Sequence, residues 1–186
     1  MNLGKILLII LALALLATLQ LTVNSSVIRA TLITMDNEAR INGISIAEAM
    51  IDEINSKAFD SSTVTKVMNF THQLTPYDRF GPEGSEKGVP SYDQEPFLSK
   101  ILFNDIDDYH RYTRIDHSSS LGAFFVRDSV IYVDSLNHDN YSSVQTWYKK
   151  IIVVVKHPNM IDSLMVNYYM LDSVMVKSLA VYRQYF

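Results

Sequence analysis

The residues best suited to chemistry are three aspartates close together in the second half of the chain. Asp105, Asp107 and Asp108 place three carboxyl groups within four positions, and Asp116 follows. Carboxylate oxygens are ligands that calcium prefers, so this cluster is a candidate calcium site. It is not an EF-hand loop, because His110 stands where that loop needs glycine and Asp116 where it needs glutamate. The alternative is a structural turn in which the aspartates accept hydrogen bonds from backbone N–H groups.

No catalytic constellation accompanies this cluster. Asp116, His117 and Ser118 are adjacent, but adjacency does not give the geometry of a triad, in which a third group orients the base. The sequence contains neither a nucleophile elbow nor a zinc-protease motif. The histidines are scattered, mostly beside turn residues: His72, His110, His117, His138 and His157. We therefore expect a protein that is not an enzyme, with no small-molecule substrate and, unless the aspartates bind calcium, no cofactor.

Composition further narrows the classes of protein to which this chain can belong. The 186 residues carry a formal net charge of −4, and the sequence shows no basic stripe that would neutralise phosphates, so we expect no nucleic-acid partner. The chain has no cysteine, which excludes disulfides, thiol nucleophiles and cysteine-ligated metals. After a membrane segment of about 25 residues, enough chain remains for one domain with its own core.

The N-terminal stretch predicts a membrane segment. Lys5 precedes an uncharged apolar run from Ile6 to Val23. About 18 residues at about 1.5 Å of rise each give a helix about 27 Å long, close to the hydrocarbon thickness of a bilayer. We predict residues 1–5 as a cytoplasmic end and residues 6–26 as a transmembrane segment.

Two interpretations of this segment stay open. One is a retained single-pass anchor with the positive end in the cytoplasm. The other is a signal peptide, with Val23-Asn-Ser25 as its cleavage site. The length of the apolar run and the lack of a helix breaker before Gly43 favour the anchor. The rest of the chain is exported in either case.

Residues 27–60 follow the pattern of an amphipathic helix. Apolar residues recur at three- and four-residue steps, and we predict that this stripe packs the helix on a sheet. The stripe consists of Ile41, Ile44, Ala47, Ile51 and Ile54. Gly43 costs about 1 kcal/mol relative to alanine inside a helix, so we expect a kink or a restart there, with Ser45 to Glu48 as a capping box.

Residues 61–186 predict an antiparallel β domain with a long loop at 72–96 that is rich in proline and glycine. Turn signals separate segments of strand character: 63–70, 122–127, 129–134, 148–157, 163–172 and 173–185. One long helix followed by strands at hairpin-like spacing gives an α+β fold, with the helix laid on an antiparallel sheet.

The order of several motifs resembles that of the pilin-like minor subunits, the minor pilins and pseudopilins. The phrase Asn37–Asp60, which ends Glu-Ile-Asn-Ser-Lys-Ala-Phe-Asp, is similar to their helix. Phe103–Tyr109 is similar to their Asp-rich turn, and the segments 125–133, 147–155 and 179–183 are similar to their strands. The family's processing site differs: Lys5 follows Gly4 here, and no acidic residue occurs before Asp36.

The resemblance implies a pilin-like fold and a non-enzymatic subunit of a type IV filament or of a type II secretion machine in bacteria. Its partners would be the membrane and other pilin-like subunits, which contact one another through their apolar helices. On this helix we expect Ile6, Leu13, Ala14 and Ala17 to serve membrane embedding and assembly, the alanines by permitting close approach. The implied location is the bacterial inner membrane, with the C-terminal domain periplasmic or extracellular.

A rival function is an extracytoplasmic binding domain, secreted after signal cleavage or tethered. It would use the 72–96 loop and the aspartates Asp105 to Asp108 to bind calcium or another ligand.

Overall fold

The computed structural model describes residues 3–161 and 171–183. It contains the helices α1 (Leu3–Asn55) and α2 (Ser99–Leu102) and the strands β1 (Thr113–Ser118), β2 (Gly122–Tyr132), β3 (Tyr148–Ile161) and β4 (Leu171–Val181). Short 3-10 turns, η1 to η5, occupy Ser61–Thr63, Thr71–Gln73, Tyr77–Arg79, Gly84–Gly88 and Asp107–Tyr109. The chain divides into two compact units, Met1–Glu38 and Ala39–Phe186, and α1 contributes residues to both.

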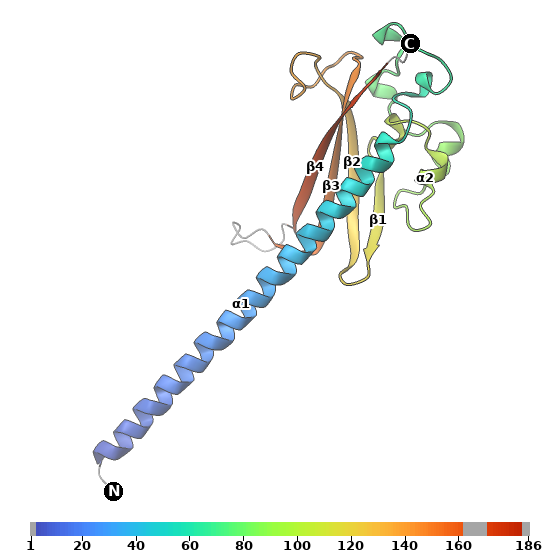
Figure 1. Cartoon of the computed structure of the whole chain (residues 1–186). Coiled ribbons are helices and arrows are strands. Elements are labelled where there is room, and N and C mark those ends of the chain that lie inside the picture. The colour runs from blue at the N-terminus through green and yellow to red at the C-terminus, as the bar shows by residue number, and fades with distance from the viewer. Residues whose placement is uncertain (1–2, 162–170, 184–186) are drawn as a thin grey trace. The chain divides into compact units, whose positions relative to one another are not determined.

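The four strands form one antiparallel sheet in the order β1-β2-β3-β4 (Figure 1). Each strand pairs with the next one in the sequence, so the sheet is a meander. The predicted α+β fold, with a long N-terminal helix on an antiparallel sheet, is confirmed. The architecture is like that of pilins.

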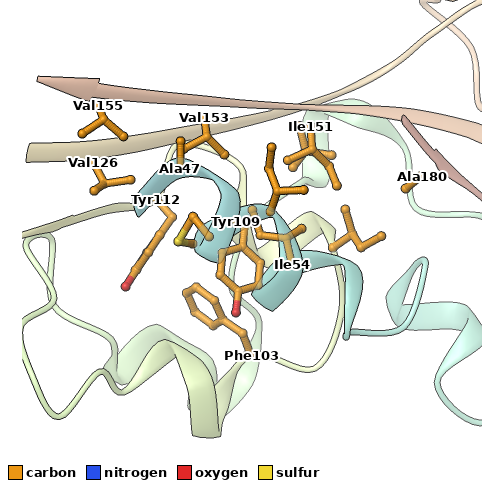
Figure 2. Close-up of a cluster of buried hydrophobic side chains, with 14 of the residues drawn as sticks. Ala47, Ile54, Phe103, Tyr109, Tyr112, Val126, Ile151, Val153, Val155 and Ala180 are labelled. Carbon is orange, nitrogen blue, oxygen red and sulfur yellow. The ribbon is translucent and has the colours of Figure 1, made fainter. Parts of the chain in front are cut away.

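One face of the sheet carries the core. Successive side chains of a strand point to opposite faces, and Ile151, Val153 and Val155 of β3 are fully buried on the face that also carries Val126 and Val130 of β2. The C-terminal part of α1 covers this face. Figure 2 shows Ala47 and Ile54 of α1 lying between two groups of side chains. One group comes from the sheet and includes Val126, Ile151, Val153 and Val155; the other consists of Phe103, Tyr109 and Tyr112. The end of the helix is therefore enclosed from two sides.

The predicted packing stripe is correct in part. Ala47, Ile51 and Ile54 are buried as predicted, but Ile41 is 65% exposed and Ile44 is 42% exposed. The helix uses a different face, marked by Ala39, Gly43, Ala47, Met50 and Ile54. At about 100° per residue, Ile44 lies about 60° and Ile41 about 120° from Ala47, on the side away from the core.

The predicted kink at Gly43 is wrong. The helix runs through Gly43, and the Ser45 hydroxyl donates to the carbonyl of Ile41 instead of capping a new helix. A Cβ on residue 43 would lie 2.6 Å from Cε of Met160, and its next neighbours would be side chains of Val155 and Val174. Residue 43 thus lies directly against side chains of β3 and β4, a contact that the sequence of the helix alone does not reveal.

Other boundaries also differ. Residues 63–70 form no strand. The first of them ends the 3-10 turn η1, which Asp60 caps by accepting a bond from the Ser62 N–H. The two predicted strands 122–127 and 129–134 are one strand, β2. The long loop 72–96 holds most of the short turns η2 to η4. The strand predicted at 163–172 lies mostly outside the described residues.

Candidate functional site

The first candidate site is the apolar surface of the N-terminal part of α1. Residues 6–28 carry no charge, and at about 1.5 Å per residue they make about 35 Å of helix. The most apolar window has a mean hydropathy of 2.7, and none of it is buried. By length and composition, this one helix near the N-terminus could span a membrane.

Hydroxyl groups in this part of α1 are hydrogen-bonded to the helix itself. The side chains of Thr18, Thr22, Ser25, Ser26, Thr31 and Thr34 each donate to a backbone carbonyl three or four residues earlier, at 2.9 to 3.0 Å. A hydroxyl without a partner is costly in hydrocarbon, where water cannot pair with it. These hydroxyl groups thus keep their donors satisfied without any neighbouring chain.

The residues expected to serve assembly share one side of this surface. Leu13 is 60% exposed, Ala14 and Ala17 are exposed, and Ile6 is half-buried. At about 100° per residue, Ile6, Leu13 and Ala17 lie within about 40° around the helix axis, and Ala14 is about 80° from Ile6. Their role in membrane embedding and assembly stays a prediction.

The second feature is a buried lysine near the end of α1. Lys149, at the start of β3, is fully buried. Its ammonium donates to Oδ2 of Asp60 at 2.9 Å, to the carbonyl of Phe59 at 2.7 Å and to Oδ1 of Asp107. Burial by itself raises the pKa of Asp60, but Lys149 and the hydroxyl of Ser62 outweigh it and lower the pKa to about 2. Lys149 therefore ties the segment after α1 to the sheet.

Aromatic rings complete the surroundings of Lys149. The rings of Phe59, Phe80 and Tyr132 lie with their centroids 4.5 to 5.2 Å from the ammonium. A cation over an aromatic face is attracted by the ring's quadrupole. The sequence carries a signal for this buried centre in the alternation of β3. The alternation that buries Ile151, Val153 and Val155 places Lys149 on the same face, and a buried lysine needs carboxylate partners.

A second ion pair fastens α1 directly. Oε2 of Glu53, on the last turns of α1, accepts from Nη1 of Arg114 in β1 at 2.8 Å, and both side chains are nearly buried. The other oxygen, Oε1, accepts from the hydroxyl of Tyr109 at 2.9 Å. Arg114 also bonds Oδ2 of Asp116 at 3.1 Å. Together with Lys149, this pair makes the end of α1 a rigid mount for the β domain.

The three aspartates of the candidate calcium site are used within the fold. Oδ1 of Asp105 accepts from the N–H of Asp107 at 2.7 Å, and Oδ2 of Asp108 accepts from the N–H groups of Asn104 and Asp105 at 3.0 and 3.2 Å. Asp107 contacts Lys149. Burial, chiefly, raises the pKa of Asp105 to about 6 and that of Asp108 to about 7, and it raises the pKa of Asp107 well above its usual value.

These contacts are those of the structural turn that the sequence left open as an alternative to calcium. Within residues 3–161 and 171–183, no group of three or more histidine or acidic side chains is arranged to hold a metal ion. The histidines are dispersed as well: His157 is buried and stacks on Phe124, while His110 bonds the carbonyl of Val130.

Comparison of the chain with protein-family models, with curated proteins and with solved structures finds no match.

Proposed function

We propose that this protein is a non-enzymatic, membrane-anchored subunit of the bacterial cell envelope that assembles through its N-terminal helix, in the manner of a minor pilin or pseudopilin. The observation that carries the proposal is the contrast within α1. An uncharged, exposed, apolar stretch with satisfied hydroxyls continues into residues that are clasped by a β domain.

The physical argument concerns the cost of exposure. The exposed large apolar side chains of residues 3–28 have 53% to 82% of their surface accessible. Apolar area contributes about 25 cal/mol per Å² when it leaves water, so such a stretch is driven into lipid or against other helices. Lys5 and Arg29 flank the uncharged residues, which suits a span whose charged ends reach the headgroups on either side.

Buried ion pairs connect the end of the anchoring helix to the β domain. Glu53 and Arg114 fix the last turns of α1 to β1, and Lys149 fixes the segment after the helix to β3. A displacement of the helix end would therefore be transmitted to the sheet. This is the property required of a subunit that is inserted into, or withdrawn from, an assembly by its helix. We place the protein in a type IV filament or a type II secretion-type machine of the inner membrane, with the N-terminus cytoplasmic and the β domain outside.

Charge in the apolar stretch tests the anchor. We expect Leu13→Arg to lose most of its membrane content, because an arginine at the centre of a membrane helix costs about 2.5–3.5 kcal/mol even on the most permissive scale. The matched control is Leu136→Arg, since Leu136 is 95% exposed on a loop of the β domain. Alkaline extraction of membranes followed by immunoblotting measures both. Equal membrane content for the Leu13 variant and the control would refute the anchor.

The intact mass of the protein from native membranes separates the proposal from its rival. A full-length chain, or one that begins at Lys5, supports a retained helix, and the second result would add processing of the family's kind. A soluble product that begins near Ser26 would identify a signal peptide. The binding-domain alternative would then replace assembly.

A further inference from the structure

The outer face of the sheet, opposite the core, holds a groove. Its floor is made by Phe125 of β2 and by Ile152 and Val154 of β3, and Tyr92 stands at its side. Phe125 is 46% exposed and Tyr92 is 60% exposed. The groove encloses about 710 Å³. No segment of residues 3–161 or 171–183 covers this apolar floor, which we call the outer groove.

Three exposed cations line the outer groove, Arg111, Arg127 and Lys156, and two buried groups of opposite charge, Arg114 and Asp128, also contribute to its lining. All three are exposed, and within the described chain none has an acidic partner or a side-chain hydrogen bond. The cations inside the domain are different, because Lys149 and Arg114 are both paired with carboxylates. The outer groove is thus apolar in its centre and positive at its rim.

The backbone of Arg111 is a second unusual feature of the rim. Its φ angle is 65°, and it is the one described residue other than glycine with a positive φ. Such a conformation costs a non-glycine residue about 1 kcal/mol or more, and it clusters at functional sites. Here it is held by the bond from the Arg111 N–H to the carbonyl of Asp128 at 3.1 Å. The strained residue presents one of the three cations to the groove.

A complementary surface lies on α1. Ile41 and Ile44 are exposed, and Glu48 and Asp52 are exposed on the same side of the helix. At about 100° per residue, these four positions fall within an arc of about 80°, turned away from the sheet. We call them the acidic stripe. It places two isoleucines next to two carboxylates, the reverse charge of the outer groove.

From this match we infer that the outer groove binds the acidic stripe of a second copy of this chain. The isoleucines would lie on Phe125, Ile152 and Val154, and the carboxylates would meet the cationic rim. The inference rests on the proposed function, since it specifies how copies brought together in the membrane contact one another outside it. It also gives a role to Ile41 and Ile44, which take no part in the core.

The arrangement has a consequence for symmetry. Stripe and groove are different surfaces on different sides of the layered domain, so their contact is heterologous rather than two-fold. A heterologous contact that does not close on itself generates an open row of subunits. Each copy would use its stripe toward one neighbour and its groove toward the other.

Photocrosslinking in native membranes tests the contact directly. Phe125 is replaced by benzoylphenylalanine, which keeps the phenyl ring, and the full-length chain is irradiated in the envelope. We expect an adduct with the mass of two chains, and mass spectrometry should place the crosslink within residues 41–52. The same analogue at Leu136 is the control and should give no such adduct. Adducts only with other proteins, or crosslinks spread equally over the two positions, would overturn the inference.

Charge reversal gives a sharper test in detergent. The stripe variant carries Glu48→Lys and Asp52→Lys, and the groove variant carries Arg127→Glu and Lys156→Glu; all four side chains are exposed, so the fold should be kept. We expect each variant alone to lose the association that the outer groove and the acidic stripe provide, while association through the apolar helix remains. A mixture of the two should form rows in which the variants alternate, because each wild-type stripe meets a wild-type groove and each reversed stripe meets a reversed groove. The quadruple variant should associate again.

Sedimentation at low and high salt measures these states, and the interaction should weaken with salt because exposed charges are screened within about 10 Å at 0.1 M. If the variants remain in the membrane but associate like the wild type, the groove contact is wrong while the proposed anchor stands. If the protein leaves the membrane as a cleaved product, the proposed function fails first.

Discussion

The two parts of α1 have the same secondary structure but opposite surroundings. In residues 6–28 large side chains such as Leu13 are exposed, and nothing in the unit Met1–Glu38 covers them. In residues 39–55 the buried positions include the small residues Ala39, Gly43 and Ala47 beside the larger Met50, Ile51 and Ile54, while the large Ile41 lies outside. Apolar size therefore does not indicate what is buried in this helix.

The difference shows which solvent each part is adapted to. Where the partner is a sheet, close approach of the backbone decides the contact, and small residues allow it. Where the partner is lipid or other helices, a continuous apolar surface is sufficient. Three substitutions, in order of decreasing effect, and a change of pH probe the β domain and its contact with α1. Urea unfolding of the full chain in detergent can be followed through Trp147, the single tryptophan, which stacks on Tyr182.

The largest effect is expected from Lys149→Met. Removal of the cation leaves Asp60 buried without its charge partner, and loss of one member of a buried ion pair costs about 3–5 kcal/mol. Lys150→Met is the control, because Lys150 pairs with Asp139, whose side chain is 93% exposed, and such pairs contribute about 0–1 kcal/mol. Addition of Asp60→Asn to the Lys149 variant should recover part of the loss. Equal unfolding midpoints for the two lysine variants would show that the buried ion pairs of Lys149 do not stabilise the β domain.

Next in size is Ile54→Ala. Ile54 is fully buried in the clasped part, and truncation of a buried isoleucine to alanine costs about 2–5 kcal/mol. The same substitution at Ile41, on the same helix but 65% exposed, should change the free energy of unfolding by less than about 0.5 kcal/mol. A large loss of stability in Ile41→Ala would mean that Ile41 belongs to the core after all.

The third prediction concerns pH. Folding raises the pKa of Asp105 to about 6 and of Asp108 to about 7, from 3.8. Between about pH 4 and pH 7 the unfolded chain thus binds fewer protons than the folded one, and stability falls as the pH rises, by up to about 1.4 kcal/mol per pH unit for each group. Asp60, with its pKa of about 2, acts in the opposite sense, because its contribution is lost as the pH falls from about 4 to about 2. The domain should be most stable near pH 4.

Asp108→Asn checks this assignment, because the amide oxygen can still accept the two N–H bonds while it carries no charge. Its stability should decline less than that of the wild type between pH 4 and pH 7. Asp52→Asn, an exposed aspartate on α1, should leave the decline unchanged. A wild-type stability that rises steadily from pH 4 to pH 7 would contradict the raised pKa values.

The smallest effect is expected from Gly43→Ala. Alanine favours the helix by about 1 kcal/mol, but its methyl group would lie 2.6 Å from the end of Met160, and overpacking of a core costs about 1–3 kcal/mol. We expect a net loss of about 1 kcal/mol. The loss should be smaller when Gly43→Ala is introduced into a chain that already carries Met160→Ala, with Met160→Ala alone as the reference. A stabilised Gly43→Ala variant would show that the contact with β3 is loose.

Local sequence patterns predict the helices and strands of this fold, but they do not predict which face of each element is buried. Length, charge and the spacing of turns were sufficient to predict a long helix and an antiparallel sheet. The choice between the stripe of Ile41 and Ile44 and the stripe of Ala39 and Gly43 depends on how closely β3 approaches the helix, and helical periodicity contains no information on that distance. The sequence pattern divides the long strand β2 in two because Asp128 interrupts its apolar residues, although Asp128 is buried with the rest of its face.

The polar centres were harder to foresee. Asp60 and Lys149 are 89 positions apart, so only the register of β3 hinted that the lysine points inward. Glu53 and Arg114 are separated by 61 positions and meet only after the helix is laid on the sheet. The aspartates at 105–108 were found as a cluster, and whether they served calcium or a turn depended on donors that the sequence does not locate.

The hydroxyls between Thr18 and Thr34 have a mechanical consequence. A threonine or serine that donates to a carbonyl of the preceding turn shares that acceptor with the helix ladder, which weakens the ladder bond and lets the helix bend. The stretch from Ile6 to Ala17 has no such groups and should resist bending. When α1 is pulled, residues 18–34 would bend while residues 6–17 stay straight. This bending would take up strain before the strain reached the bonds around Glu53 and Lys149.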